Sequence, residues 1–202
     1  MNKDQFEQMA HKYDHPDRIH LAQIIAQATN QLLNHTTYHS LLDYGGGGTG
    51  LVTLNIDHHF EQVTLMDAST QMVNIFDEKI SALEKTSIQT LVGDILADDH
   101  PLNQSTYDVI FLSLVLLHSG DYKALLHKLY THLNPGGMLI LVDFDKNENV
   151  QHPKVYNGFK QSDILETFAQ IGLSQTQAHT FYAGDHLFMN QHASIFIASG
   201  FK

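Results

Sequence analysis

The chain has 202 residues, of which 43% are hydrophobic and 16% are charged. It therefore has the length of a single domain and enough apolar residues to bury a core. Its formal net charge is −11, and its 11 Lys and Arg residues are spread along the chain. Binding to nucleic acid or to an anionic membrane surface needs clustered basic residues. We therefore expect neither as a partner.

The residue types also limit the chemistry. Cysteine is absent, which excludes disulfides and thiolate metal sites. The 15 histidines are scattered and form no His-Glu-x-x-His motif, so we expect no metal site. The N-terminal residues lack the apolar run of a signal peptide. The longest apolar stretch, residues 109–117, is about half of a membrane span. We expect a cytoplasmic protein.

Short apolar runs alternate with amphipathic stretches, a pattern typical of a mostly parallel sheet covered by helices. Before the first strand, Pro16 and Asp17 begin a helix. Its predicted apolar face consists of Ile19, Ile24, Ile25, Ala28 and Leu32.

Five strands of the sheet are predicted from apolar runs, at residues 40–44, 62–67, 88–92, 107–113 and 138–143. The fourth is almost wholly apolar, as expected for a central strand that is buried on both faces. A glycine-rich loop follows the first strand and begins a helix near Leu51, and Ser69 or Thr70 is expected to cap the next helix. A helix over residues 121–133 is predicted to stop at the Asn-Pro-Gly-Gly sequence of residues 134–137.

The C-terminal part follows a different pattern. Ser162 is predicted to cap a helix that Gly172 closes. Two β-like runs follow, at residues 177–182 and 194–199, separated by a polar segment that contains Gly-Asp-His. This arrangement predicts a closing antiparallel hairpin.

Three acidic residues, Asp43, Asp67 and Asp94, come just beyond the ends of three successive predicted strands. In an open α/β sheet, ligands bind in the crevice beyond those ends. Glycines at 45–48 and 50 let the backbone approach a ligand closely. Asp67 follows Gly47 by 20 residues, the spacing at which a carboxylate accepts hydrogen bonds from ribose hydroxyls. Each feature alone also fits a cap or a turn, but the ordered set indicates a nucleoside-binding site.

Five blocks of the sequence together resemble the class I S-adenosylmethionine-dependent methyltransferases. They are LLDYGGGGTG (41–50), VTLMDAS (63–69), GDIL (93–96), YDVIFLS (107–113) and LNPGGMLI (133–140). The tail, from Asn157-Gly158-Phe159 to Gly172, is similar to small-molecule members of the quinone-biosynthesis type.

The resemblance implies a single-domain Rossmann-like fold with a mostly parallel seven-stranded sheet, a C-terminal antiparallel hairpin and helices on both faces. Residues 1–38 would form a helical cover, residues 39–143 the cofactor-binding core and residues 144–202 the substrate side.

The resemblance also implies S-adenosylmethionine as the cofactor, S-adenosylhomocysteine as the product and a small molecule as the methyl acceptor. Gly45 and Gly47 would lie beside the methionine part of the cofactor, with Asp43 near its ammonium group. Asp67 would hold the ribose. The loop is one residue longer than is usual in the family, so the glycine that contacts the methionine part is left open.

Other residues would surround the adenine and the reactive centre. Ala68 and Met72 would pack near the adenine, while Asp94 and the backbone N–H of Ile95 would read its edge. Ser113 and Leu114 would line the cofactor where the fourth strand ends. Tyr13, in the sequence AHKYD (10–14), resembles the family's cover over the substrate, with ordinary packing as the alternative.

His118 is the candidate general base and substrate contact, because histidine titrates near neutral pH and the family often has one at this place. A purely structural histidine is the alternative. Asp143 and Asp145 are candidates to border the acceptor pocket, or else they cap neighbouring backbone.

The main rival function is a nicotinamide-dependent oxidoreductase. Gly45, Gly47 and Gly50 fit G-x-G-x-x-G, and Tyr156 and Lys160 have the spacing of the short-chain dehydrogenase pair. That pair needs a continuous helix, yet it encloses Asn157-Gly158, which is a turn signal. A non-catalytic cofactor-binding or regulatory subunit is a third alternative.

Overall fold

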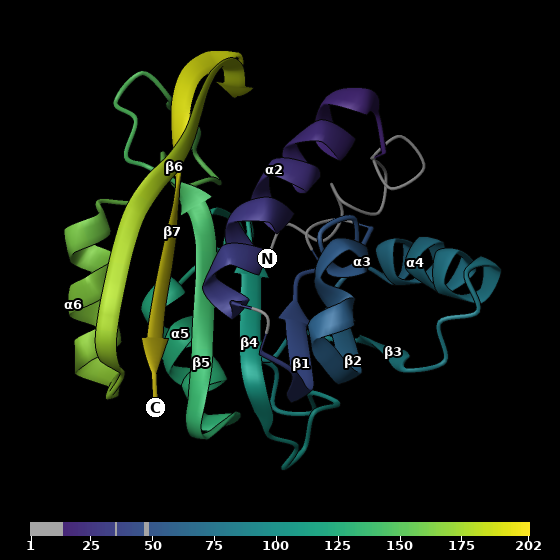
Figure 1. The fold of residues 1–202 in the computed structure, drawn as a ribbon. Coiled ribbons are helices and arrows are strands. Elements are labelled where there is room, and N and C mark those ends of the chain that lie inside the picture. Colours follow the sequence, from purple (N-terminus) through teal and green to yellow (C-terminus); the bar gives the residue numbers. More distant parts are fainter. Residues whose placement is uncertain (1–13, 35, 47–48) are drawn as a thin grey trace.

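The computed structural model describes residues 14–34, 36–46 and 49–202. Its centre is a seven-stranded sheet with the order β3-β2-β1-β4-β5-β7-β6, shown in Figure 1. The strands are β1 (Tyr38–Tyr44), β2 (Phe60–Asp67), β3 (Ile88–Val92), β4 (Tyr107–Ser113), β5 (Leu133–Phe144), β6 (Ser174–Phe188) and β7 (Gln191–Phe201). The pairs among β1 to β5 are parallel, and β7 pairs antiparallel with both β5 and β6. This topology confirms the predicted fold class.

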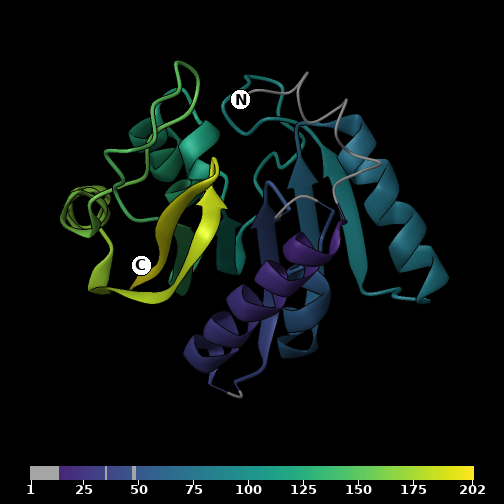
Figure 2. The ribbon, with the colours of Figure 1, turned by 90° about the horizontal axis from the view of Figure 1, so that it is seen from above.

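Helices cover both faces of the sheet. They are α2 (Pro16–Leu33), α3 (Thr53–Ile56), α4 (Thr70–Ala82), α5 (Tyr122–Thr131) and α6 (Gln161–Ile171), with short 3₁₀ helices η2 (Asp57–His59) and η3 (Leu116–His118). Viewed from above in Figure 2, α2 lies on one face, and α5 and α6 lie on the other. Among the described residues, no helix combines the length and the apolar composition that crossing a membrane requires.

Hydrogen bonds at the helix ends explain most of the helix boundaries. Ser69 caps α4, and its hydroxyl accepts a hydrogen bond from the Met72 N–H, as predicted. Asp121 caps α5 in the same way, and Gly172 ends α6 with a φ of 105°. The prediction for Ser162 was wrong: α6 begins at Gln161, with Lys160 at the N-cap position, so Ser162 lies inside its first turn.

Two helices of the N-terminal half differ from their predictions. The buried face of α2 consists of Ala22, Ile25, Ala26, Thr29 and Leu33, whereas Ile19 is exposed. The buried stripe is rotated by about one residue from the predicted one: Ile25 is shared, whereas Ile24, Ala28 and Leu32 are only partly buried. The helix after the glycine loop is only four residues long and continues as η2.

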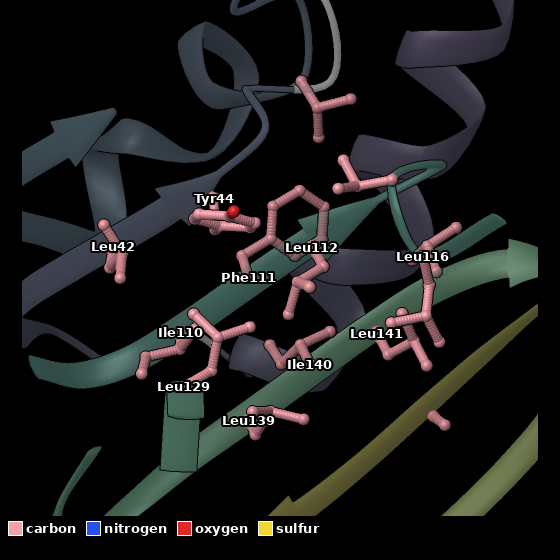
Figure 3. Close-up of a cluster of buried hydrophobic side chains, with 14 of the residues drawn as sticks. Leu42, Tyr44, Ile110, Phe111, Leu112, Leu116, Leu129, Leu139, Ile140 and Leu141 are labelled. Carbon is pink, nitrogen blue, oxygen red and sulfur yellow. The ribbon is translucent and has the colours of Figure 1, made fainter. Parts of the chain in front are cut away.

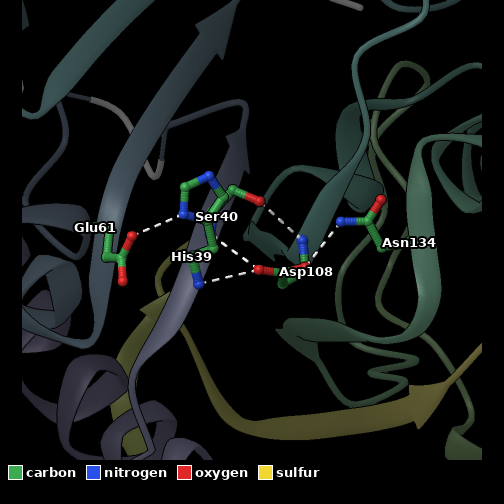
Figure 4. Close-up of polar contacts among 5 residues, drawn as sticks. All are labelled: His39, Ser40, Glu61, Asp108 and Asn134. Atoms are coloured by element: carbon green, nitrogen blue, oxygen red, sulfur yellow. Dashed lines mark hydrogen bonds and ion pairs between the residues drawn. The ribbon is translucent and has the colours of Figure 1, made fainter.

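The Asn-Pro-Gly-Gly sequence of residues 134–137 lies within β5, at the amino end of the sheet, and does not end α5 as predicted. There Asn134 donates a hydrogen bond to Asp108 over 2.8 Å, and Asp108 accepts the backbone N–H groups of His39 and Ser40. Figure 4 shows how this network joins β1, β4 and β5. A Cβ on Gly137 would lie 2.9 Å from the Asp108 carbonyl oxygen, so this motif serves strand packing.

The C-terminal hairpin is longer than predicted. Gly184, Asp185 and His186 belong to β6, and the turn lies at Met189 and Asn190, both with positive φ. A pair of positive φ values is what a two-residue hairpin turn needs. The hairpin tip therefore extends above the carboxyl ends of the parallel strands in Figure 1.

The core is formed mainly by β1, β4 and β5 together with the helices that cover them. Figure 3 shows Leu42, Phe111 and Ile140 among the side chains of this cluster, and all three are fully buried. Tyr44 is also in this cluster and is 2% exposed. The core thus fixes the strands whose ends carry the candidate site.

Candidate active site

The three predicted aspartates lie at one edge of the sheet, because parallel strands bring their carboxyl ends together. Asp43 is level with Leu65 across β1 and β2, and Asp67 is level with Val92 across β2 and β3. Asp94 lies two residues beyond Val92, the last residue of β3. We call this β1–β3 edge, with the glycine loop, the cofactor side.

Asp43 is fully buried at the end of β1. Its Oδ2 accepts a hydrogen bond from the Thr53 hydroxyl, whereas Oδ1 has no hydrogen-bond partner among the described residues. Burial raises the pKa of Asp43 to about 7, and the Thr53 hydrogen bond partly opposes that shift. A buried carboxylate oxygen without a partner is costly, so this position fits a cationic group of a ligand.

Asp67 is buried at the end of β2, and its Oδ1 accepts a hydrogen bond from the Ser69 N–H over 2.7 Å. Ala68 and Met72 are also buried, and Met72 lies in the first turn of α4. The predicted ribose and adenine contacts are therefore neighbours at the junction of β2 and α4. Their roles toward the cofactor stay predictions.

Asp94 and Ile95 meet an aromatic residue that sequence reasoning did not single out. The hydroxyl of Tyr44 donates to Asp94 Oδ1 over 2.9 Å and accepts the Ile95 N–H over 3.4 Å. The Leu96 N–H also donates to Asp94 Oδ1, over 3.1 Å. Burial, followed by the charge of Asp94, raises the pKa of Tyr44, so this hydroxyl keeps its proton. Tyr44 thus fixes the loop that was predicted to read the adenine.

The glycine loop turns sharply between β1 and α3. Gly45 has a φ of +81°, and a Cβ there would lie 2.3 Å from Val115 Cγ2. Gly50 has a φ of +70°, and a Cβ there would lie 2.2 Å from Phe76 Cε2. Both positions therefore exclude a side chain. Gly47 and Tyr13, which the sequence also predicted for the site, lie outside the described residues.

A contact between three polar residues ties the start of α2 to this loop. The Thr49 hydroxyl donates a hydrogen bond to Asp14, and Lys79 of α4 forms an ion pair with Asp14. Lys79 also donates to the Thr49 carbonyl oxygen over 2.9 Å. Thr49 is fully buried. We call this arrangement the Asp14–Lys79–Thr49 contact.

Beside the cofactor side, a pocket of about 650 Å³ opens beyond the ends of β4 and β5. We call it the histidine-rich pocket. Its wall comes from α2, η3 and the β6–β7 hairpin. The lining residues are His15, Asp17, Arg18, His20, Leu21, Leu114, Leu117, His118, Phe144, Tyr182, Asp185, His186, Leu187, Phe188 and Met189.

Ser113 is the last residue of β4, and Leu114 follows it, between the two regions. Ser113 is buried, and Leu114 is half-buried with a φ of 55°. Positive φ is uncommon for a side chain like leucine, and here the Leu114 N–H is held by the Val142 carbonyl oxygen over 2.9 Å. Because Leu114 lines the histidine-rich pocket, the predicted cofactor boundary and this pocket are adjacent.

His118 lines the same pocket from η3 and is half-buried. Burial, followed by the charge of Arg18, lowers the pKa of His118 to about 4. Its imidazole is therefore neutral near pH 7. Asp143 does not line the pocket. Its two carboxylate oxygens accept the N–H groups of Leu117 and Phe144, so it holds η3, and with it His118, against the end of β5.

Asp145 also has a structural environment. Its Oδ2 accepts hydrogen bonds from Thr180 and Ser194, each over 2.8 Å, and its Oδ1 accepts one from Gln161 over 2.7 Å. It joins β6, β7 and α6 and does not line the pocket. Tyr156 and Lys160, the rival dehydrogenase pair, lie in non-helical chain, so their spacing does not place them on one helical face.

The described part of the chain holds no cluster of three or more His, Cys, Asp or Glu side chains that could bind a metal ion. The residues that sequence reasoning missed are Tyr44, Thr53 and Arg18. Their roles depend on which strand ends and helices meet in space, and no local motif marks such contacts.

Comparisons with known proteins agree with a cofactor-binding site at this edge of the sheet. The family model described as a methyltransferase domain matches residues 42–141. A ubiquinone/menaquinone biosynthesis C-methyltransferase, UbiE, of Pseudoalteromonas translucida is 28% identical over 153 residues, which cover 72% of this chain and 58% of that protein. The corresponding protein of Saccharophagus degradans is 27% identical over 186 residues, covering 88% of this chain and 73% of that one.

Solved structures show the same fold. A SAM-dependent methyltransferase from Aquifex aeolicus aligns with a TM-score of 0.69 at 18% identity, covering 96% of this chain and 97% of that one. The fold and strand order are those of class I methyltransferases. The chain belongs to the class I S-adenosylmethionine-dependent methyltransferase family, with a distant resemblance to UbiE.

Proposed function

We propose that this chain transfers a methyl group from S-adenosylmethionine to a small-molecule acceptor. The observation that carries the proposal is Asp43, whose buried carboxylate has one oxygen without a partner among the described residues. Asp43 lies beside the glycine loop at the carboxyl edge of the sheet. A cationic ammonium group of the cofactor would supply the positive counter-charge and the hydrogen-bond donor that this carboxylate lacks.

Other groups on the cofactor side fit the remaining parts of the same molecule. Asp67 offers carboxylate oxygens for the ribose hydroxyls. Ala68 and Met72 provide apolar surface for the adenine, and Asp94 provides an acceptor at its edge. The Ile95 N–H would serve as a donor there by exchanging its 3.4 Å hydrogen bond to the Tyr44 hydroxyl for one to the base. When bound, S-adenosylmethionine supplies a methyl group on a positively charged sulfur.

The histidine-rich pocket is the proposed acceptor site. Its volume of about 650 Å³ is in the usual range for small-molecule sites, and it adjoins the cofactor side at Leu114. The chain's main task is to align the acceptor and to exclude water. Leu114, Leu117 and Phe188 make part of this wall apolar.

His118 is proposed to contact the acceptor. Because its imidazole is neutral near pH 7, it can accept a hydrogen bond from an acceptor O–H or N–H and orient the nucleophile. A pKa of about 4 makes it a weak base, since the best general bases titrate near the working pH. Orientation is therefore its proposed main contribution.

The acidic composition of the chain supports a small molecule, and not nucleic acid, as the acceptor. The oxidoreductase alternative has no support from the non-helical Tyr156–Lys160 segment. A non-catalytic cofactor-binding protein would bind S-adenosylmethionine in the same way but would not transfer its methyl group.

The test is calorimetric titration with S-adenosylmethionine, S-adenosylhomocysteine and, separately, NADH, followed by a screen of acceptors for methyl transfer. We expect micromolar binding of the first two, none of NADH, and transfer to at least one acceptor. Binding of NADH alone would overturn the proposal, and cofactor binding without transfer to any acceptor would favour the non-catalytic role.

A further inference from the structure

Tyr44 connects the end of β1 to the loop after β3, although β2 lies between these two strands. It is the last residue of β1 and is level with Met66 of β2. Its ring belongs to the core cluster of Figure 3, and the residue is 2% exposed. Because side chains in a packed core are held in single rotamers, the Tyr44 hydroxyl has a fixed position beside Asp94.

The two oxygens of the Asp94 carboxylate have different environments. Oδ1 accepts the Tyr44 hydroxyl over 2.9 Å and the Leu96 N–H over 3.1 Å. No group among the described residues donates a hydrogen bond to Oδ2. The two donors therefore orient the carboxylate so that the protein satisfies one oxygen and the other is left for a ligand.

The free oxygen of Asp94 matches one group of adenine. Asp94 is half-buried, so a ligand can reach its carboxylate, whereas Tyr44 is buried. The exocyclic amino group of adenine donates hydrogen bonds, and an ionised carboxylate oxygen only accepts them. A base without the amino group leaves this bond unmade, and a site built to bind such a group discriminates against the analogue that lacks it.

We infer that Tyr44 is a positioning residue that makes the cofactor site selective for a base with an amino group, because its hydroxyl holds Asp94 so that Oδ2 faces that group. Without the hydroxyl, only the Leu96 N–H orients the carboxylate. The Ile95 N–H reaches the Tyr44 hydroxyl over 3.4 Å, so a ligand can take this longer bond while the bond to Asp94 stays in place. The inference rests on the proposed function, because it concerns how the same cofactor site selects its base.

The test compares S-adenosylhomocysteine with its deamino analogue, in which purine replaces adenine, by calorimetric titration of the full chain. The wild type should bind S-adenosylhomocysteine at least about tenfold more tightly, because the analogue cannot donate to the ionised carboxylate. In Tyr44→Phe, which keeps the ring and removes the hydroxyl, this ratio should fall below about threefold. The inference is overturned if the wild type does not reach the first ratio or if Tyr44→Phe stays above the second.

The ratio of the two affinities separates positioning from a purely structural role, because a general loosening of the site weakens both ligands equally and leaves the ratio unchanged. Tyr107→Phe is the matched control. Tyr107 is also a buried tyrosine of the sheet, but it is the first residue of β4 and lies at the amino end. Its variant should keep the wild-type ratio, and an equal fall in Tyr107→Phe would overturn the inference.

Asp94→Asn tests the same orientation with Tyr44 intact, should Tyr44→Phe not fold. Tyr44 and Leu96 both donate, so they should hold the amide oxygen and turn the amide NH₂ group toward the amino group of adenine. Two donors cannot pair, so this variant should bind the deamino analogue more tightly than S-adenosylhomocysteine. Equal affinities, or a retained preference for S-adenosylhomocysteine, would overturn the inference.

The outcomes distinguish this inference from the proposed function. The expected ratios without methyl transfer to any acceptor would contradict the proposed function alone. Binding of S-adenosylhomocysteine and methyl transfer without the preference over the deamino analogue would contradict the role of Tyr44 alone. Failure of the wild type to bind either ligand would contradict both.

Discussion

On the cofactor side, Asp43, Asp67 and Asp94 are held by hydrogen bonds from neighbouring hydroxyls or main-chain N–H groups. In the histidine-rich pocket, by contrast, several polar side chains, including His15, His20 and His186, are exposed to solvent. The first region is shaped before any ligand arrives, and the second leaves room for groups to adjust. The β1–β3 part of the carboxyl edge is therefore specified by short-range sequence motifs. The part beyond β4 and β5 is specified by segments that are distant in the sequence and meet there.

Gly50→Ala is the substitution on the cofactor side from which we expect the largest loss of stability. A Cβ there would overlap the Phe76 ring at 2.2 Å, at a φ of +70°. We expect a loss of about 2–5 kcal/mol in the free energy of unfolding, from left-handed strain and overpacking, measured by urea denaturation.

Two other glycines separate these causes. Gly136 has a φ of +75° but no atom within 4 Å of an added Cβ, so Gly136→Ala should cost only about 1–2 kcal/mol. Gly120 has neither feature, and Gly120→Ala should be close to neutral. Equal stability of Gly50→Ala and Gly120→Ala would show that the loop is not tightly packed.

Asp67→Ala tests the cofactor side by ligand binding. We expect the affinity for S-adenosylhomocysteine to fall by about 1.5–3 kcal/mol, the usual range for hydrogen bonds to a charged group, in a calorimetric titration. Asp121→Ala is the control, because Asp121 is also an aspartate at a helix N-terminus but follows β4 and η3 and is not part of the β1–β3 edge. Unchanged affinity in Asp67→Ala would remove Asp67 from the site.

The raised pKa of Asp43, about 7, predicts a pH dependence of cofactor binding. A bound ammonium favours the ionised carboxylate, so below about pH 7 a proton must leave before binding. The affinity should therefore fall by up to about tenfold per pH unit below that value. Asp43→Asn should bind weakly with a flat profile, and Asp77→Asn, on α4, should behave like the wild type. A slope that survives in Asp43→Asn would assign the proton to another group.

The smallest expected effect is on stability and comes from His118, in the histidine-rich pocket. The pKa of His118 is about 4 in the folded chain against its ordinary value of 6.5, so between these values the unfolded chain binds a proton that the folded chain does not. Its contribution to stability is present above pH 6.5 and is lost as the pH falls toward 4.

Between pH 7.5 and pH 5, we expect the wild type to lose about 1 kcal/mol more unfolding free energy than His118→Gln, after allowance for partial exposure. Thermal denaturation at the two pH values measures this difference. The control is His127→Gln, at an exposed position of α5. Parallel pH dependence of the wild type and His118→Gln would mean that His118 is not shielded from solvent.

The cofactor side could largely be predicted from sequence. Strands β3 and β4 have the predicted bounds, because turn signals flank both apolar runs. Asp43, Asp67 and Asp94 meet at one edge because each follows a parallel strand, and strand order alone fixes that outcome. The cap at Ser69 depends on local hydrogen bonds, which sequence patterns encode directly.

The pocket side could not be predicted in the same way. The turn at Met189 and Asn190 lacks the glycine that marks most two-residue hairpin turns, so the sequence pattern predicts the connection in the polar segment before it. Arg18 and Phe188 are 170 residues apart and line one pocket only because α2 and the hairpin meet above the sheet. The Tyr44–Asp94 hydrogen bond likewise depends on tertiary packing.

The Asp14–Lys79–Thr49 contact joins these two regions physically. Asp14 lies two residues before α2, the helix that carries Arg18, and Thr49 belongs to the glycine loop of the cofactor side. A ligand on either side that tightens or loosens this junction changes the free energy available to the other. Such coupling is reciprocal by thermodynamic necessity, so an acceptor that strengthens cofactor binding must itself bind more strongly to the cofactor-loaded chain.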